Sequence, residues 1–139
     1  MKLFFDTNVI LDLILKRELF FNDVAAIISF SESNDNVKLY VSSLSIVNAN
    51  YIASKFTSKK NVIESLKMLR LAFDVIEVSV KEIDAALYSD FNDFEDAVQY
   101  FTALKMSCNY IITRDSKDFK TSKIPALSPN EFLKIIKQS

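Results

Sequence analysis

Short apolar runs and longer amphipathic stretches alternate along the chain. The short runs have the length and the β-branched or aromatic content of buried strands, whereas the longer stretches repeat their apolar positions at the spacing of a helix. The predicted strands are residues 2–5, 38–42, 75–78 and 110–113, with a weaker one near residue 126. The predicted helices are residues 9–16, 22–31, 45–56, 58–71, 79–88 and 93–106, with a last one that begins at residue 128.

Polar side chains that can cap a helix mark the starts of several of these stretches. The signal is strongest at Ser128, which is followed by Pro129 and, three residues on, by Glu131. This spacing is a capping box with proline at the first helical position. The other capping candidates are Asn22, Ser45, Ser58 and Ser79.

The alternation of strands and helices indicates crossover connections. Such connections join parallel neighbours and place helices on both faces of a sheet. We therefore predict an α/β fold around a central, mainly parallel sheet. The length of 139 residues is typical of one domain, so we expect a single domain over residues 1–139.

The residue types that are absent exclude several classes of catalytic and binding site, whereas the net charge excludes none. The chain has no His and no Gly. Catalysis by Ser-His or Cys-His pairs and metal binding through imidazole are therefore excluded, and so are glycine-rich phosphate loops and dinucleotide-binding turns. The net charge of −1 identifies no partner. Carboxylates remain as the obvious catalytic groups.

The sequence also favours a cytoplasmic protein. Cys108 is the only cysteine, and its surroundings are typical of a buried, reduced thiol. The first apolar run is interrupted by Asp6 and Asn8, and no run without charges is long enough to cross a bilayer. We expect neither a secretory leader nor a membrane span.

Two aspartates follow predicted strands directly. Asp6 follows the first strand, and Asp115 follows the strand that ends near Thr113. The carboxyl ends of parallel strands share one edge of the sheet, where ligands of open α/β folds bind, so these side chains can meet there. Asp6 can equally be a simple cap of the next helix. Asp118 can join this group or cap the turn before Phe119.

A third candidate lies at the start of the helix predicted at residues 93–106. Asp93 and Asp96 extend the apolar stripe of that helix toward its N-terminus, whereas Glu95 is predicted to lie on the far side. A carboxylate that heads a buried stripe needs a hydrogen bond, a paired charge or a metal. The alternative is that Asp93 is the N-cap and Asp96 a first-turn acid that the helix dipole favours.

Asn48 is a polar residue in a comparable position on another helix. It shares a predicted helix face with Tyr51, Ile52 and Phe56, so its amide needs a partner. Its simplest role is a hydrogen bond to a neighbouring backbone group.

Three segments together resemble the PIN domain family. They are LFFDTNVI (3–10), DFEDA (93–97) and IITRD (111–115), followed by Asp118 and Phe119. The resemblance covers essentially the whole chain, and it is greatest to the toxins of VapBC toxin–antitoxin pairs. It implies a three-layer α/β/α fold with a sheet of about five strands, and an endoribonuclease that holds Mg²⁺ or Mn²⁺ in acidic residues.

The resemblance also assigns roles to individual residues. Asp6, Asp96 and Asp115 match the acids that bind metal and catalyse RNA hydrolysis, and Asp93 lies in the same motif as Asp96. Asp118 matches a frequently acidic position. The polar positions that shape the pocket are matched by Thr7, Asn8 and Thr113.

One position departs from the family pattern. Where the family usually places a Glu, this chain has Asn48, which can coordinate a cation through its carbonyl oxygen but adds no charge. An alternative follows: a PIN-like module that binds RNA or protein with weak or no nuclease activity.

The predicted partners are RNA, an antitoxin protein and a second copy of the chain. Arg114 and Lys117, just after the last strand motif, are candidates for contacts with RNA phosphates. The resemblance implies an antitoxin that occupies a groove between helices, and a homodimer.

Overall fold

A sheet of five parallel strands forms the centre of the computed structural model, which describes residues 1–138. The strands are β1 (Lys2–Phe5), β2 (Lys38–Ser42), β3 (Phe73–Ile76), β4 (Tyr110–Ile112) and β5 (Ala126–Leu127). Their order across the sheet is β3-β2-β1-β4-β5, and every neighbouring pair is parallel. The predicted parallel α/β sheet is confirmed.

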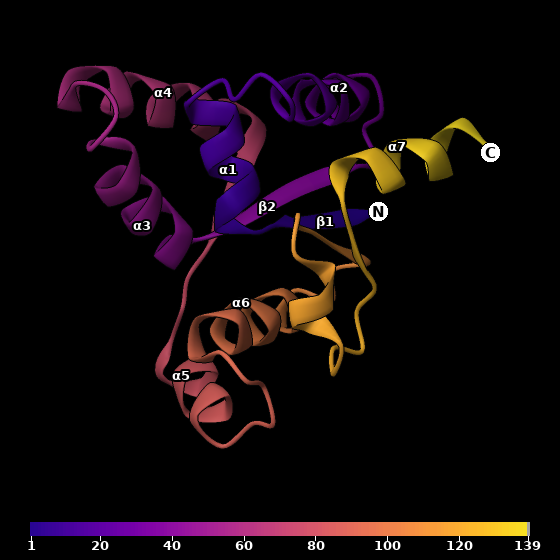
Figure 1. Cartoon of the computed structure of the whole chain (residues 1–139). Coiled ribbons are helices and arrows are strands. Elements are labelled where there is room, and N and C mark those ends of the chain that lie inside the picture. The colour runs from indigo at the N-terminus through magenta and orange to yellow at the C-terminus, as the bar shows by residue number, and fades with distance from the viewer. Residues whose placement is uncertain (139) are drawn as a thin grey trace.

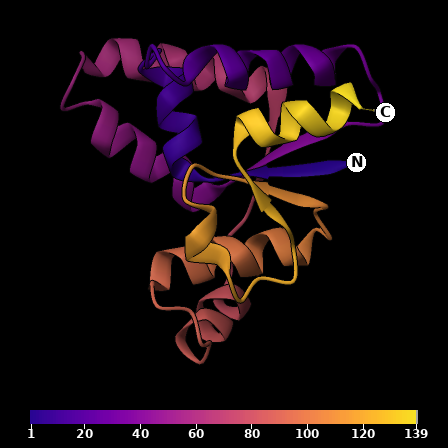
Figure 2. The ribbon, with the colours of Figure 1, turned by 45° about the vertical axis from the view of Figure 1, so that its right-hand side comes forward.

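Helices cover both faces of this sheet, as the predicted three-layer architecture requires (Figure 1). One layer contains α1 (Thr7–Ile14), α2 (Phe21–Glu32), α3 (Ser43–Ala53), α4 (Lys59–Ala72) and α7 (Pro129–Lys137). The other layer contains α5 (Val80–Leu87), α6 (Phe94–Lys105) and the short 3-10 helix η1 (Ser116–Phe119). The α7 helix ends on the side of the molecule where β1 begins (Figures 1 and 2).

The central strand β1 shows why both faces are covered. Leu3 and Phe5 point into the core beneath α1 and α2, whereas Phe4 points into the core beneath α6, and all three are fully buried. Alternate side chains of a strand point to opposite faces, so an apolar run needs a helix layer on each side. Burial of each Phe contributes about 1.5–3 kcal/mol.

Two predicted helix caps are wrong. The α3 helix begins at Ser43 rather than at Ser45, because the Ser42 hydroxyl accepts a hydrogen bond from the Ser45 amide at 3.0 Å. The α2 helix begins at Phe21 and has no side-chain cap, so Asn22 lies inside it. The amides of its N-cap Phe20 and its first residue Phe21 donate instead to the carbonyl of Arg17 in the preceding turn.

The third strand was predicted two residues too late. The α4 helix runs directly into β3 at Phe73, which pairs with Leu39, so the two elements have no loop between them. β3 is an edge strand, and its polar residue Asp74 is exposed there. The cap at Ser128 is confirmed as a full capping box. No helix among residues 1–138 is long and apolar enough to span a bilayer.

Candidate metal centre

Asp6 lies where two neighbouring strands end. Phe5 of β1 pairs with Ile112 of β4, so Asp6 and Thr113 follow at the same edge of the sheet. The Asp6 carboxylate accepts a hydrogen bond from the Thr7 amide at 2.9 Å and another from the Thr113 hydroxyl at 2.8 Å. Asp6 therefore caps α1 with one oxygen and faces β4 with the other.

Like charges surround this buried carboxylate. Burial raises the pKa of Asp6 from 3.8 to about 6; the hydrogen bonds from Thr113 and Thr7 lower the pKa, and the charges of Glu95 and Asp115 raise it. The residue is 7% exposed. Both burial and the neighbouring negative charges disfavour the ionised form of this carboxylate, so a bound cation would stabilise it.

Asp96, in the first turn of α6, is also surrounded by carboxylates. Burial is the largest of the causes that raise the pKa of Asp96 from 3.8 to about 7, and the charges of Asp6, Asp93 and Asp118 follow in that order. Its backbone amide donates to the Asp93 carboxylate at 2.9 Å, so Asp93 is the N-cap of α6 and Asp96 lies in the first turn. Both acids thus have the predicted helix-start roles, and Asp96 in addition acts electrostatically with Asp6.

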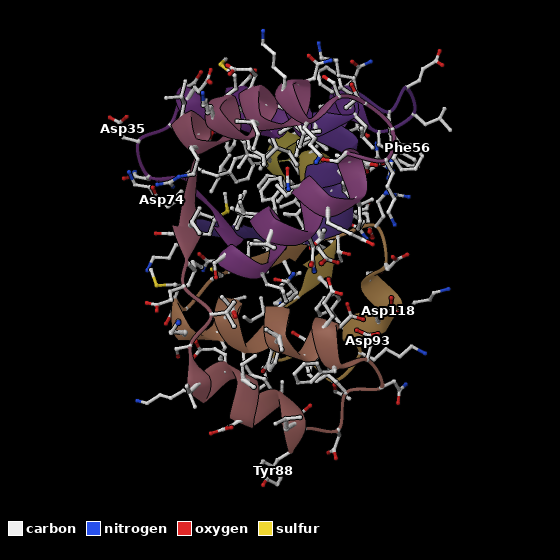
Figure 3. The ribbon with its side chains drawn as sticks, turned by 90° about the vertical axis from the view of Figure 1, so that its left-hand side faces the viewer. Asp35, Phe56, Asp74, Tyr88, Asp93 and Asp118 are labelled. Carbon is white, nitrogen blue, oxygen red and sulfur yellow. The ribbon has the colours of Figure 1, made fainter. Side chains whose placement is uncertain are left out.

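A cavity of about 240 Å³ opens beside Asp96, between the start of α6 and η1. Figure 3 shows Asp93 and Asp118 close together, one from each of these elements. The full lining is Asp90, Phe91, Asn92, Asp93, Asp96, Lys117, Asp118, Lys120 and Thr121.

Asp115 is more exposed and is linked to Asp6 through polar side chains. Its carboxylate accepts a hydrogen bond from the Asn8 amide at 3.1 Å, and its backbone amide donates to the Thr113 hydroxyl oxygen at 3.1 Å. That same hydroxyl donates to Asp6. The pocket residues Asn8 and Thr113 therefore set the position of Asp115 relative to Asp6.

Glu95 does not lie on the far side of α6, as the helical pattern had predicted. Its Oε1 accepts a hydrogen bond from Asn48 Nδ2 of α3 at 3.1 Å, and its charge acts on both Asp6 and Asp96. The partner of Asn48 is thus a carboxylate from another helix and not a neighbouring backbone group. A first-turn side chain projects toward and beyond the helix end, so the stripe that the rest of the helix buries did not predict its direction.

A buried polar cluster below these acids also escaped the sequence analysis. Gln99 of α6 donates to the hydroxyls of Thr7 at 3.1 Å and Ser45 at 2.7 Å, and Ser42 donates to Ser45 at 3.2 Å. Gln99, Ser42 and Ser45 are fully buried. The available signal was an amide between apolar neighbours at the centre of a helix, because a buried amide requires partners. This cluster joins α1, α3 and α6.

A comparison with known families decides the classification. The PIN domain family matches residues 2–117. The chain belongs to the PIN domain family.

This PIN domain is similar to proteins of three bacteria. The chain is 29% identical over 136 residues to Ribonuclease VapC1 of Aquifex aeolicus, an alignment that covers 94% of this chain and 92% of the relative. The fold is similar to VapBC2 of Rickettsia felis, crystallised with a DNA fragment from its promoter, with a TM-score of 0.67, 16% identity, and coverage of 92% and 98% of the two chains. It is also similar to VapC20 of Mycobacterium tuberculosis, a toxin that cleaves the sarcin-ricin loop, with a TM-score of 0.67, 12% identity, and coverage of 86% and 94%.

The two predicted RNA contacts of this PIN domain lie in different surroundings. Arg114 Nε is 2.8 Å from Asp12 Oδ2, and the guanidinium lies over the Phe20 ring at 4.3 Å from its centroid. Lys117 is exposed and lines the cavity beside Asp96. Asp12, fully buried in α1, was not singled out by the sequence analysis.

The oxygen donors of this PIN domain fit a hard cation that keeps much of its water. Within residues 1–138, no three carboxylate or thiol groups are arranged to enclose a metal by themselves. Mg²⁺ commonly binds through one or two carboxylates and retains several waters. Asp6 and Asp96 provide two such carboxylates, and the like charges around them favour a cation.

Proposed function

We propose that this protein is an endoribonuclease that depends on Mg²⁺ or Mn²⁺ and hydrolyses phosphodiester bonds of RNA. One observation carries the proposal: Asp6, the N-cap of α1, and Asp96, in the first turn of α6, come from elements far apart in sequence, and the charge of Asp6 raises the pKa of Asp96. The name of the Aquifex relative, a ribonuclease, supports the same activity.

Three aspartates would bind the cation at this site. Asp6 and Asp96 would hold the cation, and Asp115 would bind it directly or through water. Such a cation supplies a hydroxide nucleophile at neutral pH and stabilises charge on the phosphoryl oxygens. The bonds from Thr7 and Thr113 fix both oxygens of Asp6, so this ligand is held in place before any cation binds.

RNA would approach along the basic residues near the cavity. Lys117 and Lys120 line it together with the acids, so their ammonium groups offset part of the repulsion between carboxylates and phosphates. Arg114 is already paired with Asp12. We therefore place the principal phosphate contacts at Lys117 and Lys120.

We further propose that the protein is the toxin of a toxin–antitoxin pair that acts in the cytoplasm. A groove of about 550 Å³ between α1, α2 and α4 is lined largely by apolar side chains, among them Met68 and Leu71, which are 67% and 82% exposed. An amphipathic segment of an antitoxin would cover it. Tyr51 and Phe56 are also exposed, at 66% and 69%, and a second copy of the chain would cover them in a homodimer.

The test is cleavage of a labelled RNA by the purified protein with Mn²⁺, with Mg²⁺ and with EDTA. Wild-type protein should cleave only with metal, and Asp6→Asn and Asp96→Asn should each lower kcat/KM by about 100-fold or more. Asp35→Asn, which removes an exposed carboxylate before β2, is the matched control and should cleave normally. Cleavage that survives both site substitutions would reject the assignment. RNA binding without cleavage under any metal would instead favour the binding module.

A further inference from the structure

We propose that Glu95 is a further carboxylate of the metal centre, and that Asn48 is the positioning residue that holds it there. The inference rests on the proposed function, since it adds a residue to the centre formed by Asp6 and Asp96. Its basis is a contact between two helices that are far apart in sequence.

Two successive contacts join α3 to α6. The inner one is the 2.7 Å hydrogen bond from Gln99 to Ser45, and both residues are fully buried. The outer one is the 3.1 Å hydrogen bond from Asn48 to Glu95. Asn48 lies three positions after Ser45, and Glu95 lies four positions before Gln99, so each outer residue is one helical turn from its inner counterpart.

This geometry fixes where Glu95 can be. The inner contact is enclosed and brings the two helices together, and the residues one helical turn further along also face each other. Asn48 then donates across that gap to Glu95 Oε1. The Glu95 carboxylate is thereby held at the end of α6 where Asp96 lies.

The chemistry of the partner preserves the charge of Glu95. An amide donor is neutral, so it orients the carboxylate without cancelling its charge, whereas Lys or Arg at position 48 would neutralise it. A carboxylate has two oxygens and several lone pairs, so one hydrogen bond leaves it able to accept from metal-bound water. The proximity of Glu95 to the centre agrees with its effect in raising the pKa of both Asp6 and Asp96.

We place Glu95 at the water shell of the cation rather than in direct contact with it. Residues 1–138 contain no set of three acids that encloses a metal, while a hydrated Mg²⁺ is well served by carboxylates that accept from its waters. Such outer partners typically change metal affinity by about 10–100-fold. The neutral Asn48 would thus contribute to metal binding by orienting the Glu95 carboxylate.

The experiment measures Mn²⁺ affinity by electron paramagnetic resonance, without RNA. Glu95→Gln should weaken binding by about tenfold. The exchange N48E/E95Q keeps one carboxylate and one amide at the same contact, and it should restore affinity to within about threefold of wild type. Asp35→Asn serves as the charge control and should bind normally. Glu95 and Asn48 lie on partly or fully exposed surface, and thermal melting in EDTA would verify that each variant is folded.

The outcomes separate this inference from the proposed function. Equal affinity in Glu95→Gln and Asp35→Asn would overturn the role of Glu95, and failure of the exchange to restore affinity would overturn the role of Asn48. In both cases Asp6→Asn should still abolish binding. If Asp6→Asn binds Mn²⁺ as wild type does, the metal centre itself is wrong.

Discussion

Asp6 and Asp12 are both buried aspartates of the first helical segment, but opposite kinds of charge surround them. Asp12 lies 2.8 Å from Arg114 Nε and 3.2 Å from an Arg17 guanidinium nitrogen. Asp6 contacts an amide and a hydroxyl, and the charges that act on it belong to other carboxylates. Asp12 therefore has positively charged partners within the fold, whereas the charges that act on Asp6 are negative.

This difference separates a structural acid from a candidate ligand. Burial raises the pKa of both carboxyls, so a raised pKa alone does not tell them apart. The sign of the neighbouring charges does, because two guanidinium groups lower the pKa of Asp12 whereas Glu95 and Asp115 raise that of Asp6. A buried acid whose charged neighbours are also acids can be stabilised by a cation that binds from solution.

The largest expected effect is on stability, and it tests this comparison directly. Asp12→Asn leaves two partly exposed guanidinium groups beside a neutral side chain, so the free energy of unfolding should fall by about 1.5–3 kcal/mol. Asp6→Asn relieves repulsion and keeps a group of the same shape, so without metal its stability should stay within about 1 kcal/mol of wild type. Urea unfolding in EDTA measures both. A loss as large for Asp6→Asn would show that Asp6 is structural too.

The second prediction concerns pH. An unfolded chain has Asp6 and Asp96 at their usual pKa of 3.8, whereas the folded state holds them at about 6 and about 7. The folded state therefore binds more protons between these limits, and its stability without metal should fall as the pH rises from about 4 to about 7. Thermal melting in EDTA across this range should show the decline.

Added Mn²⁺ should oppose that decline, because a cation stabilises the ionised carboxylates. The gain in melting temperature on adding Mn²⁺ should be small near about pH 5 and larger above about pH 7. The double variant D6N/D96N should show a flatter pH dependence in EDTA and little response to Mn²⁺. A metal response that is independent of pH would contradict the involvement of these two acids.

The smallest expected effect concerns the hydroxyl that donates to Asp6. Thr113→Val removes this bond inside the protein and should lower stability by about 1 kcal/mol. Because the bond lowers the pKa of Asp6, its loss should also shift the midpoint of Mn²⁺ binding to higher pH. Thr113→Ser keeps the hydroxyl and should restore the wild-type midpoint. Identical titrations for Val and Ser would exclude the hydroxyl as a determinant of metal binding.

The fold was predictable because local and global signals agree along most of the chain. The strand at Lys2–Phe5 is apolar at every buried position, and the capping box at Ser128 marks its helix without ambiguity. The errors occur where tertiary contacts override local signals. Phe73 joins the edge of the sheet directly from a helix, and the start of α2 is set by bonds to Arg17 rather than by Asn22.

The candidate site was predictable only in part. The order of elements predicts that Asp6 and Asp115 lie at the same edge of a parallel sheet. The pairing of β1 with β4, which brings the two strand ends together, comes from the structure. The direction of Glu95 depends on α3, which belongs to the opposite layer of the fold. The role of Asp12 likewise depends on Arg114, which is 102 positions away. Helical periodicity identifies a face but not which distant element will meet it.

The placement of β1 between β2 and β4 also determines when the acids can assemble during protein synthesis. The Thr113 hydroxyl reaches Asp6 across 107 positions of sequence, and Asp96 is likewise made long after Asp6. At a translation rate of about 5–20 residues per second, roughly 5–20 seconds pass between the appearance of the two halves on the ribosome. Each nascent chain therefore lacks the assembled group of acids until most of its residues have been synthesised.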